Sequence, residues 1–142
     1  MKALVESAGG VASQATLDGH TLTFDQVPPT PGGENRGPSP LDVMALAVGA
    51  CAHYYAAAFL FARKLPTERL RVEVEFEKVR EPVPRIGRLT LRVMLPAGLP
   101  EHYATAIERA VRHCPAYGTL LHPPDVELTF EPKAAQVSAP AA

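Results

Sequence analysis

A run of 20 residues from Val43 to Ala62 carries no formal charge and constrains the fold more than any other stretch of the chain. His53 is its only clearly polar side chain, and the run is long enough to cross a bilayer. Eight of its residues are alanine and one is glycine, so it lacks the dense Leu, Ile, Val and Phe content of a membrane span. We therefore predict no membrane association, and a helix that is buried on every side within a protein or a dimer.

Both ends of this helix are marked in the sequence. Ser39 is placed to cap it, Pro40 suits the first helical position, and Asp42 brings a negative charge to the first turn. The helix should end near residues 63–64, ahead of Pro66.

Short strands are expected before the helix. Residues 15–17 and 22–24 flank Asp18-Gly19, a dipeptide that suits the two positive-φ positions of a tight hairpin turn, and residues 1–7 can add a third strand. Residues 27–40 are rich in proline and glycine, so they predict a long loop that leads to the helix. Loops of this length within a compact domain are often functional.

Two longer strands are expected after the helix. Apolar residues alternate with charged ones over residues 70–79. In the second strand, Leu89, Leu91, Val93 and Leu95 alternate with Arg88, Thr90 and Arg92. If the two strands pair as a hairpin, Glu77 faces Arg88 and Glu73 faces Arg92, which is a favourable cross-strand pattern on a solvated face.

The last third of the chain predicts one more helix and one more strand. Pro100 opens a helix with apolar positions at the 3.6-residue period, Pro115 stops it, and residues 126–131 alternate as a final strand. The order of elements predicts a single α+β domain over residues 1–131 with largely antiparallel sheets. Residues 132–142 are rich in alanine and proline, and we expect them to be a disordered tail.

Composition excludes several classes of function. The 142 residues have a formal net charge of −1, so the chain lacks the basic excess of a generic nucleic-acid binder. The N-terminus has no apolar run of signal-peptide length, which favours a cytoplasmic protein.

The two cysteines are the strongest candidates for chemistry. Cys51 lies within the apolar helix and Cys114 lies on the apolar stripe of the second one, so both thiols point towards a buried interior. Each can be an ordinary core residue. If the two meet, Cys51 suits the attacking thiolate and Cys114, at a helix C-terminus that disfavours an anion, suits the resolving thiol. Arg36, in the loop before the helix, is the first candidate for a cation near Cys51.

Two other interpretations of these residues are weaker. Cys51 and His53 are two positions apart on a helix and point to nearly opposite sides, which argues against a shared metal ion. A purely structural disulfide closing 63 residues would add roughly 4 kcal/mol of stability, but such a bond does not persist in a reducing cytosol unless it cycles or has a very low potential.

The motifs around both cysteines resemble the OsmC/Ohr family of osmotically inducible and organic-hydroperoxide-resistance proteins. The resemblance covers residues 32–130 and rests on four short motifs, which are Gly37-Pro38-Ser39-Pro40-Leu41-Asp42, Gly49-Ala50-Cys51, His113-Cys114-Pro115 and Gly118-Thr119-Leu120. It implies an OsmC-like fold, in which two long central helices pack together in an intertwined homodimer with the sheets outside. It also implies a thiol peroxidase that uses no metal, heme or flavin.

The resemblance assigns roles to particular residues. Cys51 would attack an organic hydroperoxide, and possible substrates extend to hydrogen peroxide. Cys114 would convert the resulting sulfenic acid to a disulfide. An external dithiol, of lipoyl type, would restore both thiols. Arg36 and Asp42 are the candidate groups that assist Cys51, and Tyr54, Tyr55 and Phe59 are candidates to line an apolar access path.

Two positions depart from the catalytic branches of that family. Those branches place a glutamate directly after the motif proline and an arginine in the N-terminal strands, whereas here Leu41 follows Pro40 and no arginine precedes Arg36. One residue on a helix is about 100° of rotation, so Asp42 points elsewhere than that glutamate. A second hypothesis therefore stays open, namely a non-enzymatic dimer that binds an apolar ligand or partner and keeps its cysteines as core residues.

Overall fold

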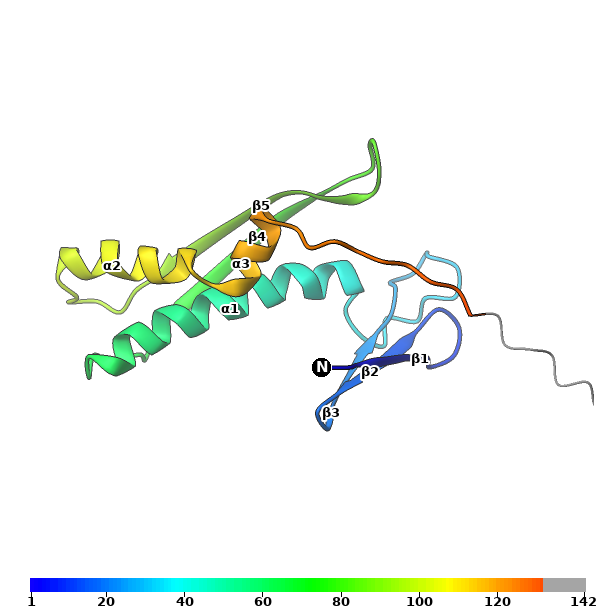
Figure 1. The fold of residues 1–142 in the computed structure, drawn as a ribbon, viewed down its shortest axis with the longest axis horizontal. Helices are drawn as coiled ribbons and strands as arrows, with labels where there is room; N and C mark the ends of the chain where they lie inside the picture. The colour runs from blue at the N-terminus through cyan, green and yellow to red at the C-terminus, as the bar shows by residue number, and fades with distance from the viewer. Residues whose placement is uncertain (132–142) are drawn as a thin grey trace, which may run out of the picture.

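The N-terminal strands form a sheet of their own at the start of the long helix (Figure 1). In this computed structural model, which describes residues 1–131, β1 (Leu4–Ser7), β2 (Ser13–Leu17) and β3 (His20–Phe24) are antiparallel in the order β1-β2-β3. Asp18 and Gly19 join β2 to β3 with φ of 48° and 80°, which is the left-handed pair that the turn requires. The predicted hairpin and the third strand are confirmed, and the expected tail at residues 132–142 lies outside the described residues.

Helix α1 (Pro40–Ala62) begins as its sequence predicts. Ser39 is the N-cap, with its Oγ accepting a hydrogen bond of 3.3 Å from the backbone N–H of Asp42. One face of α1 is buried and is made of small and aliphatic residues, namely Ala45, Val48, Gly49, Ala52, Ala56 and Leu60. Gly49 lies so close to β4 that a side chain there would overlap Val74.

The other face of α1 is open within one chain. Met44, Leu46, Tyr54 and Phe61 are 44%, 53%, 65% and 79% exposed, respectively. The helix is long and apolar enough to cross a membrane, but in this fold it packs against β4, α2 and α3. The expected burial on all sides is thus reached on one face only within a single chain.

Strands β4 (Arg71–Val79) and β5 (Arg85–Met94) form the second sheet, an antiparallel hairpin whose turn projects beyond the helices (Figure 1). The predicted register is confirmed, because Glu73 pairs with Arg92 and Glu77 with Arg88. Arg92 Nη1 lies 3.2 Å from a carboxylate oxygen of Glu73 on the solvated face.

Helix α2 (Glu101–Arg112) lies beside α1, and together they build the main core of the chain (Figure 1). That core is formed by Ala56, Leu60, Leu70 and Ile107. A short third helix, α3 (Pro115–Leu121), follows Cys114. Pro115, which was expected only to end the preceding helix, also serves as the first residue of α3.

The expected final strand is not formed within the described chain. Residues 126–130 are extended and exposed, and they pair with no strand of residues 1–131. Alternation predicts a strand only where an edge is available, and in a single chain this segment reaches none.

Candidate active site

The fold brings Cys51 and Cys114 together from positions far apart in the sequence. Cys51 lies within α1 and is half-buried, whereas Cys114 joins α2 to α3 and is 1% exposed. Cys51 lies near enough to Cys114 to help raise the pKa of its thiol, and both are free thiols. The two residues are therefore neighbours in space, which a disulfide between them would require.

The surroundings of Cys114 favour its neutral form. Burial raises the pKa of the Cys114 thiol above 9.0, and the contact with Cys51 raises it further. The backbone N–H groups of Tyr117 and Ala116, in the first turn of α3, oppose this effect without cancelling it. Cys114 is therefore a protonated thiol at neutral pH, held beside a more accessible partner.

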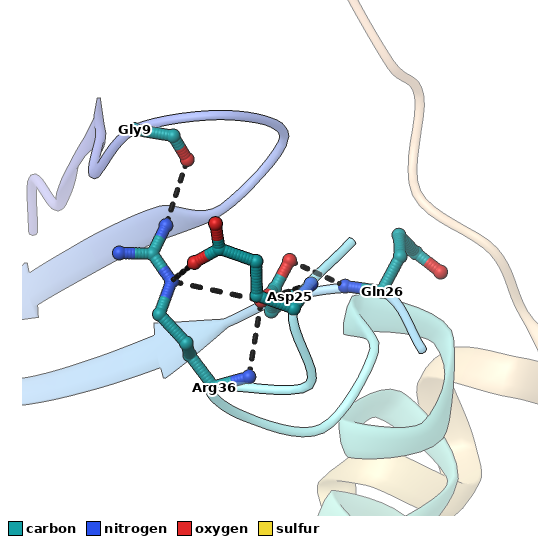
Figure 2. Close-up of polar contacts among 5 residues, drawn as sticks. Gly9, Asp25, Gln26 and Arg36 are labelled. Atoms are coloured by element: carbon teal, nitrogen blue, oxygen red, sulfur yellow. Dashed lines mark hydrogen bonds and ion pairs between the residues drawn. The ribbon is translucent and has the colours of Figure 1, made fainter. Parts of the chain in front are cut away.

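Arg36 is held by an acidic network in the loop before α1 (Figure 2). The carboxylate of Asp25, which is 2% exposed, accepts backbone N–H bonds from Gln26, Glu34 and Arg36 at 2.8, 3.1 and 3.0 Å. Arg36 Nε lies 3.7 Å from Asp25 and 3.3 Å from Glu34, and its Nη2 donates to the carbonyl of Gly9 at 2.8 Å. This network, which the sequence analysis missed, ties the loop to the N-terminal sheet.

The network predicts a pH-dependent contribution to stability. The N–H bond from Arg36 is the main cause that lowers the pKa of Asp25 below 3.8, although burial opposes it. A lowered pKa means that the charged carboxylate stabilises the fold well above pH 3.8, and that this contribution is lost as the pH falls through the folded pKa. We expect Asp25→Asn to lower Tm at neutral pH, with the difference from wild type shrinking below pH 3.8 in thermal scans.

Glu34→Gln is the matched control, because the Glu34 side chain is 68% exposed and contributes only an outer ion pair with Arg36. Equal losses of Tm for Asp25→Asn and Glu34→Gln would contradict the assigned role of the buried carboxylate.

Asp42 pairs with Lys78 rather than with Arg36. Lys78 Nζ lies 2.6 Å from Asp42 Oδ1, and the hydrogen bond from Lys78 is the first cause that holds the pKa of Asp42 below its usual range. Lys78 is about half exposed and lies directly after a register shift in β4, so the alternation of the strand does not mark it as a partner of Asp42.

The three candidate lining residues separate into two groups. Tyr54 and Tyr55 contact each other edge to face, with ring centroids 5.4 Å apart, on the open part of α1. Phe59 instead packs edge to face against Tyr103 of α2 at 6.1 Å, with the guanidinium of Arg63 over its ring. Only the tyrosines are therefore positioned for a surface that a partner or substrate could reach.

The histidines beside the cysteines do not converge on one point. His53 is exposed on α1, and His113 ends α2 with its Nδ1 2.8 Å from the carbonyl of Arg109. Among residues 1–131, no three His, Cys, Asp or Glu side chains are grouped to hold a metal ion.

The arrangement of the two cysteine motifs on this fold agrees with a known family. Residues 32–129 match the family model for the OsmC-like protein. The chain belongs to the OsmC-like family. The match covers both cysteine motifs and all three helices of this OsmC-like protein.

Solved structures share the fold at low sequence identity. A Psychrobacter arcticus protein assigned to osmotic stress and detoxification has a TM-score of 0.74 at 14% identity, covering 84% of this chain and 87% of its own. The OsmC-like protein of Mycoplasma pneumoniae has a TM-score of 0.71 at 18% sequence identity, covering 84% of this chain and 86% of its own. An organic hydroperoxide resistance protein from Legionella pneumophila has a TM-score of 0.56 at 20% sequence identity, covering 84% of this chain and 87% of its own. A comparison with curated proteins found no match.

Proposed function

We propose that this OsmC-like protein is a cysteine-based peroxidase that reduces organic hydroperoxides, and to a lesser extent hydrogen peroxide. The observation that carries the proposal is the contact between a half-buried Cys51 and a fully buried Cys114. One thiol is partly open to a substrate, and the other is buried beside it.

The chemistry needs two steps. The Cys51 thiolate attacks the terminal oxygen of the hydroperoxide, the O–O bond breaks, and the alkoxide leaves as an alcohol after taking a proton. Cys51 is thereby oxidised to a sulfenic acid. The sulfur of Cys114 then attacks the sulfenic sulfur, water leaves, and a disulfide joins the two residues. An external dithiol, of lipoyl type, reduces the disulfide by thiol exchange and is itself oxidised.

The remaining candidates act around this pair. We assign Arg36 and Asp42 to positioning, because each fixes a part of the chain that leads into α1 and hence to Cys51. Tyr54 and Tyr55 follow Cys51 on α1 and supply the apolar surroundings of the substrate, whereas Phe59 supports this part of α1 from the core side. The open apolar face of α1 supports a homodimer. We place this homodimer in the cytoplasm and assign an external dithiol as its reductant.

Rapid mixing of the reduced protein with cumene hydroperoxide tests the proposal. We expect a disulfide between Cys51 and Cys114, detected by mass analysis without reductant, to form at least on the order of 100-fold faster than an ordinary free thiol reacts. Hydrogen peroxide, run in parallel, should react more slowly. A reaction no faster than that of a free thiol, or one seen only after denaturation, would support the non-enzymatic dimer instead.

A further inference from the structure

The connection between α1 and β4 concentrates positive charge. Residues 63–71, which we call the basic turn, contain four exposed basic side chains and Glu68 as their only acid, although the whole chain has a net charge of −1. The four are Arg63, Lys64, Arg69 and Arg71. Among residues 1–131, no acidic side chain forms an ion pair with any of them. The basic turn lies at the end of α1 that is farther from the N-terminal sheet (Figure 1).

Lys64 occupies a backbone position that favours glycine. It follows Arg63, the C-cap of α1, and has a φ of 54°. The backbone N–H of Lys64 donates to the carbonyl of Phe61 at 3.0 Å. The next N–H, that of Leu65, donates to the carbonyl of Leu60 at 3.0 Å. These two bonds define a helix end whose left-handed residue is usually glycine, because a side chain there is sterically unfavourable.

Arg69 repeats this pattern in the turn that leads into β4. The backbone N–H of Leu70 donates to the carbonyl of Thr67 at 3.1 Å, and Arg69 is the third residue of that turn, with a φ of 69°. A positive φ at this position favours glycine or asparagine. Two successive turns thus each carry a basic side chain where the backbone favours glycine. Unfavourable backbone conformations of this kind cluster at functional sites, which points to a use for the two charges.

The basic turn offers charge without an apolar surface. Its leucines face inward, because Leu70 is buried in the core and Leu65 packs against that core. A membrane surface would need apolar side chains to insert beside the cations. An extended nucleic acid would run past the turn onto the remainder of the chain, which is negatively charged overall. A compact acidic protein surface is the partner that fits, since opposite charges steer such a partner to this one end.

We propose that the basic turn is the docking surface for the dithiol reductant, and that this dithiol is carried on an acidic protein. The inference rests on the function proposed above and describes one of its partners. An uncharged hydroperoxide gains nothing from four cations, so the other reactant, the dithiol, is the one that they serve. Helix α1 ends at Ala62, roughly 17 Å beyond Cys51 at 1.5 Å per residue, so a docked carrier holds its dithiol within reach of the disulfide.

Docking raises the local concentration of the dithiol and leaves the exchange chemistry unchanged. One thiolate of the reductant attacks a sulfur of the disulfide between Cys51 and Cys114, which forms a mixed disulfide and releases one protein thiolate. That thiolate takes up a proton. The second thiolate of the reductant then attacks the mixed disulfide, so the reductant leaves as its own disulfide and the second cysteine is also restored as a thiol.

Binding of fluorescein-labelled hexa-aspartate, followed by fluorescence anisotropy, tests the docking surface without any redox step. The host is the Cys51→Ser, Cys114→Ser protein, with and without Lys64→Gly, Arg69→Gly and Arg71→Gln. At about 20 mM salt we expect the three substitutions to weaken binding by about fivefold or more, and this difference to vanish near 0.5 M salt. Glycine suits both left-handed positions, so the variant should keep the Tm of its host.

A matched control removes three exposed cations from other parts of the chain. Lys2→Gln, Arg80→Gln and Arg109→Gln change the net charge by the same amount and leave the basic turn intact. This control should bind hexa-aspartate within about twofold of the host, because steering depends on the local field. Equal weakening by the two sets would overturn the inference. Tighter binding of the basic turn to phosphatidylserine vesicles than to hexa-aspartate would overturn it as well.

Reduction of the disulfide tests whether the docked partner is the reductant. Wild-type protein oxidised with diamide is mixed with a dihydrolipoyl-lysine peptide whose linker of ten Gly and Ser residues, spanning roughly 17 Å, ends in hexa-aspartate or hexa-asparagine. We expect the acidic probe to reduce the protein roughly tenfold faster at low salt. This advantage should be lost in the variant with Lys64→Gly, Arg69→Gly and Arg71→Gln, whereas free dihydrolipoamide should reduce both proteins equally fast.

The outcomes separate this inference from the function on which it rests. Equal rates with the two probes would overturn the docking of the reductant, even for a protein that reduces hydroperoxides. A protein that forms no disulfide with diamide would overturn the proposed function and the assignment of the reductant together. The binding of hexa-aspartate does not depend on either cysteine, so the two failures are distinguishable.

Discussion

Cys51→Ser is expected to abolish the fast reaction with hydroperoxide, lowering its rate by on the order of 10³ or more, since no other residue supplies the attacking sulfur. Cys114 does not replace it, because burial raises the pKa of Cys114 and keeps it as a neutral thiol in this variant too. Stopped-flow mixing with cumene hydroperoxide, followed by mass analysis, measures the effect.

Cys114→Ser is the matched variant for the second step. It should still consume one equivalent of hydroperoxide per chain but stop at a sulfenic acid on Cys51, which dimedone traps. In wild type, the rate of disulfide formation should rise about tenfold per pH unit until the pH reaches the raised pKa of Cys114, because the thiolate is the attacking form. If Cys51→Ser reacts as fast as wild type, the attacking residue has been misassigned. If Cys114→Ser forms no trappable sulfenic acid, Cys51 is not a peroxide-reactive thiol.

Local signals accounted for much of the fold. Ser39 and Pro40 fix the start of α1 through groups within one turn, and Asp18-Gly19 fixes a hairpin through backbone conformation alone. The alternation in β4 and β5 fixed their register, because a slip by one residue would turn every apolar side chain to solvent. Each of these signals lies in residues that are neighbours in the chain, so the sequence alone was enough to predict these elements.

The charged contacts at the start of α1 were harder to predict, since their partners are distant in the sequence. Lys78 pairs with Asp42. The carboxylate of Asp25 accepts hydrogen bonds from backbone N–H groups nine and eleven residues later in the chain. Nothing local indicates such partners, because a lysine or an aspartate near a turn is usually solvated. The segment 126–130 was predicted as a strand from its own alternation, but an edge to receive it depends on surfaces that one chain does not bring together.

Gly49→Val is expected to destabilise the fold by about 3 kcal/mol or more, the largest loss of stability from a single substitution that we predict. Gly49 is buried where α1 crosses β4, and an added Cβ would overlap Cγ2 of Val74. Val74 has little freedom to move away, because a β-branched side chain has few rotamers. Gly49→Ala should lose less, about 1–2 kcal/mol, since alanine recovers about 1 kcal/mol of helix propensity. Urea unfolding followed by circular dichroism, at fixed protein concentration, measures both.

Gly118→Ala in α3 is the control for helix propensity without overlap, because a Cβ at that position meets nothing within 4 Å. It should stabilise the protein by roughly 0.5–1 kcal/mol, in the opposite direction to the Gly49 variants. The difference matters for function, since Gly49 lies two residues before Cys51 and the approach of α1 to β4 sets the depth at which that thiol lies. A Gly49→Val protein as stable as wild type would mean that α1 and β4 are not held at this distance. In that case the fold would not fix the half-burial of Cys51 either.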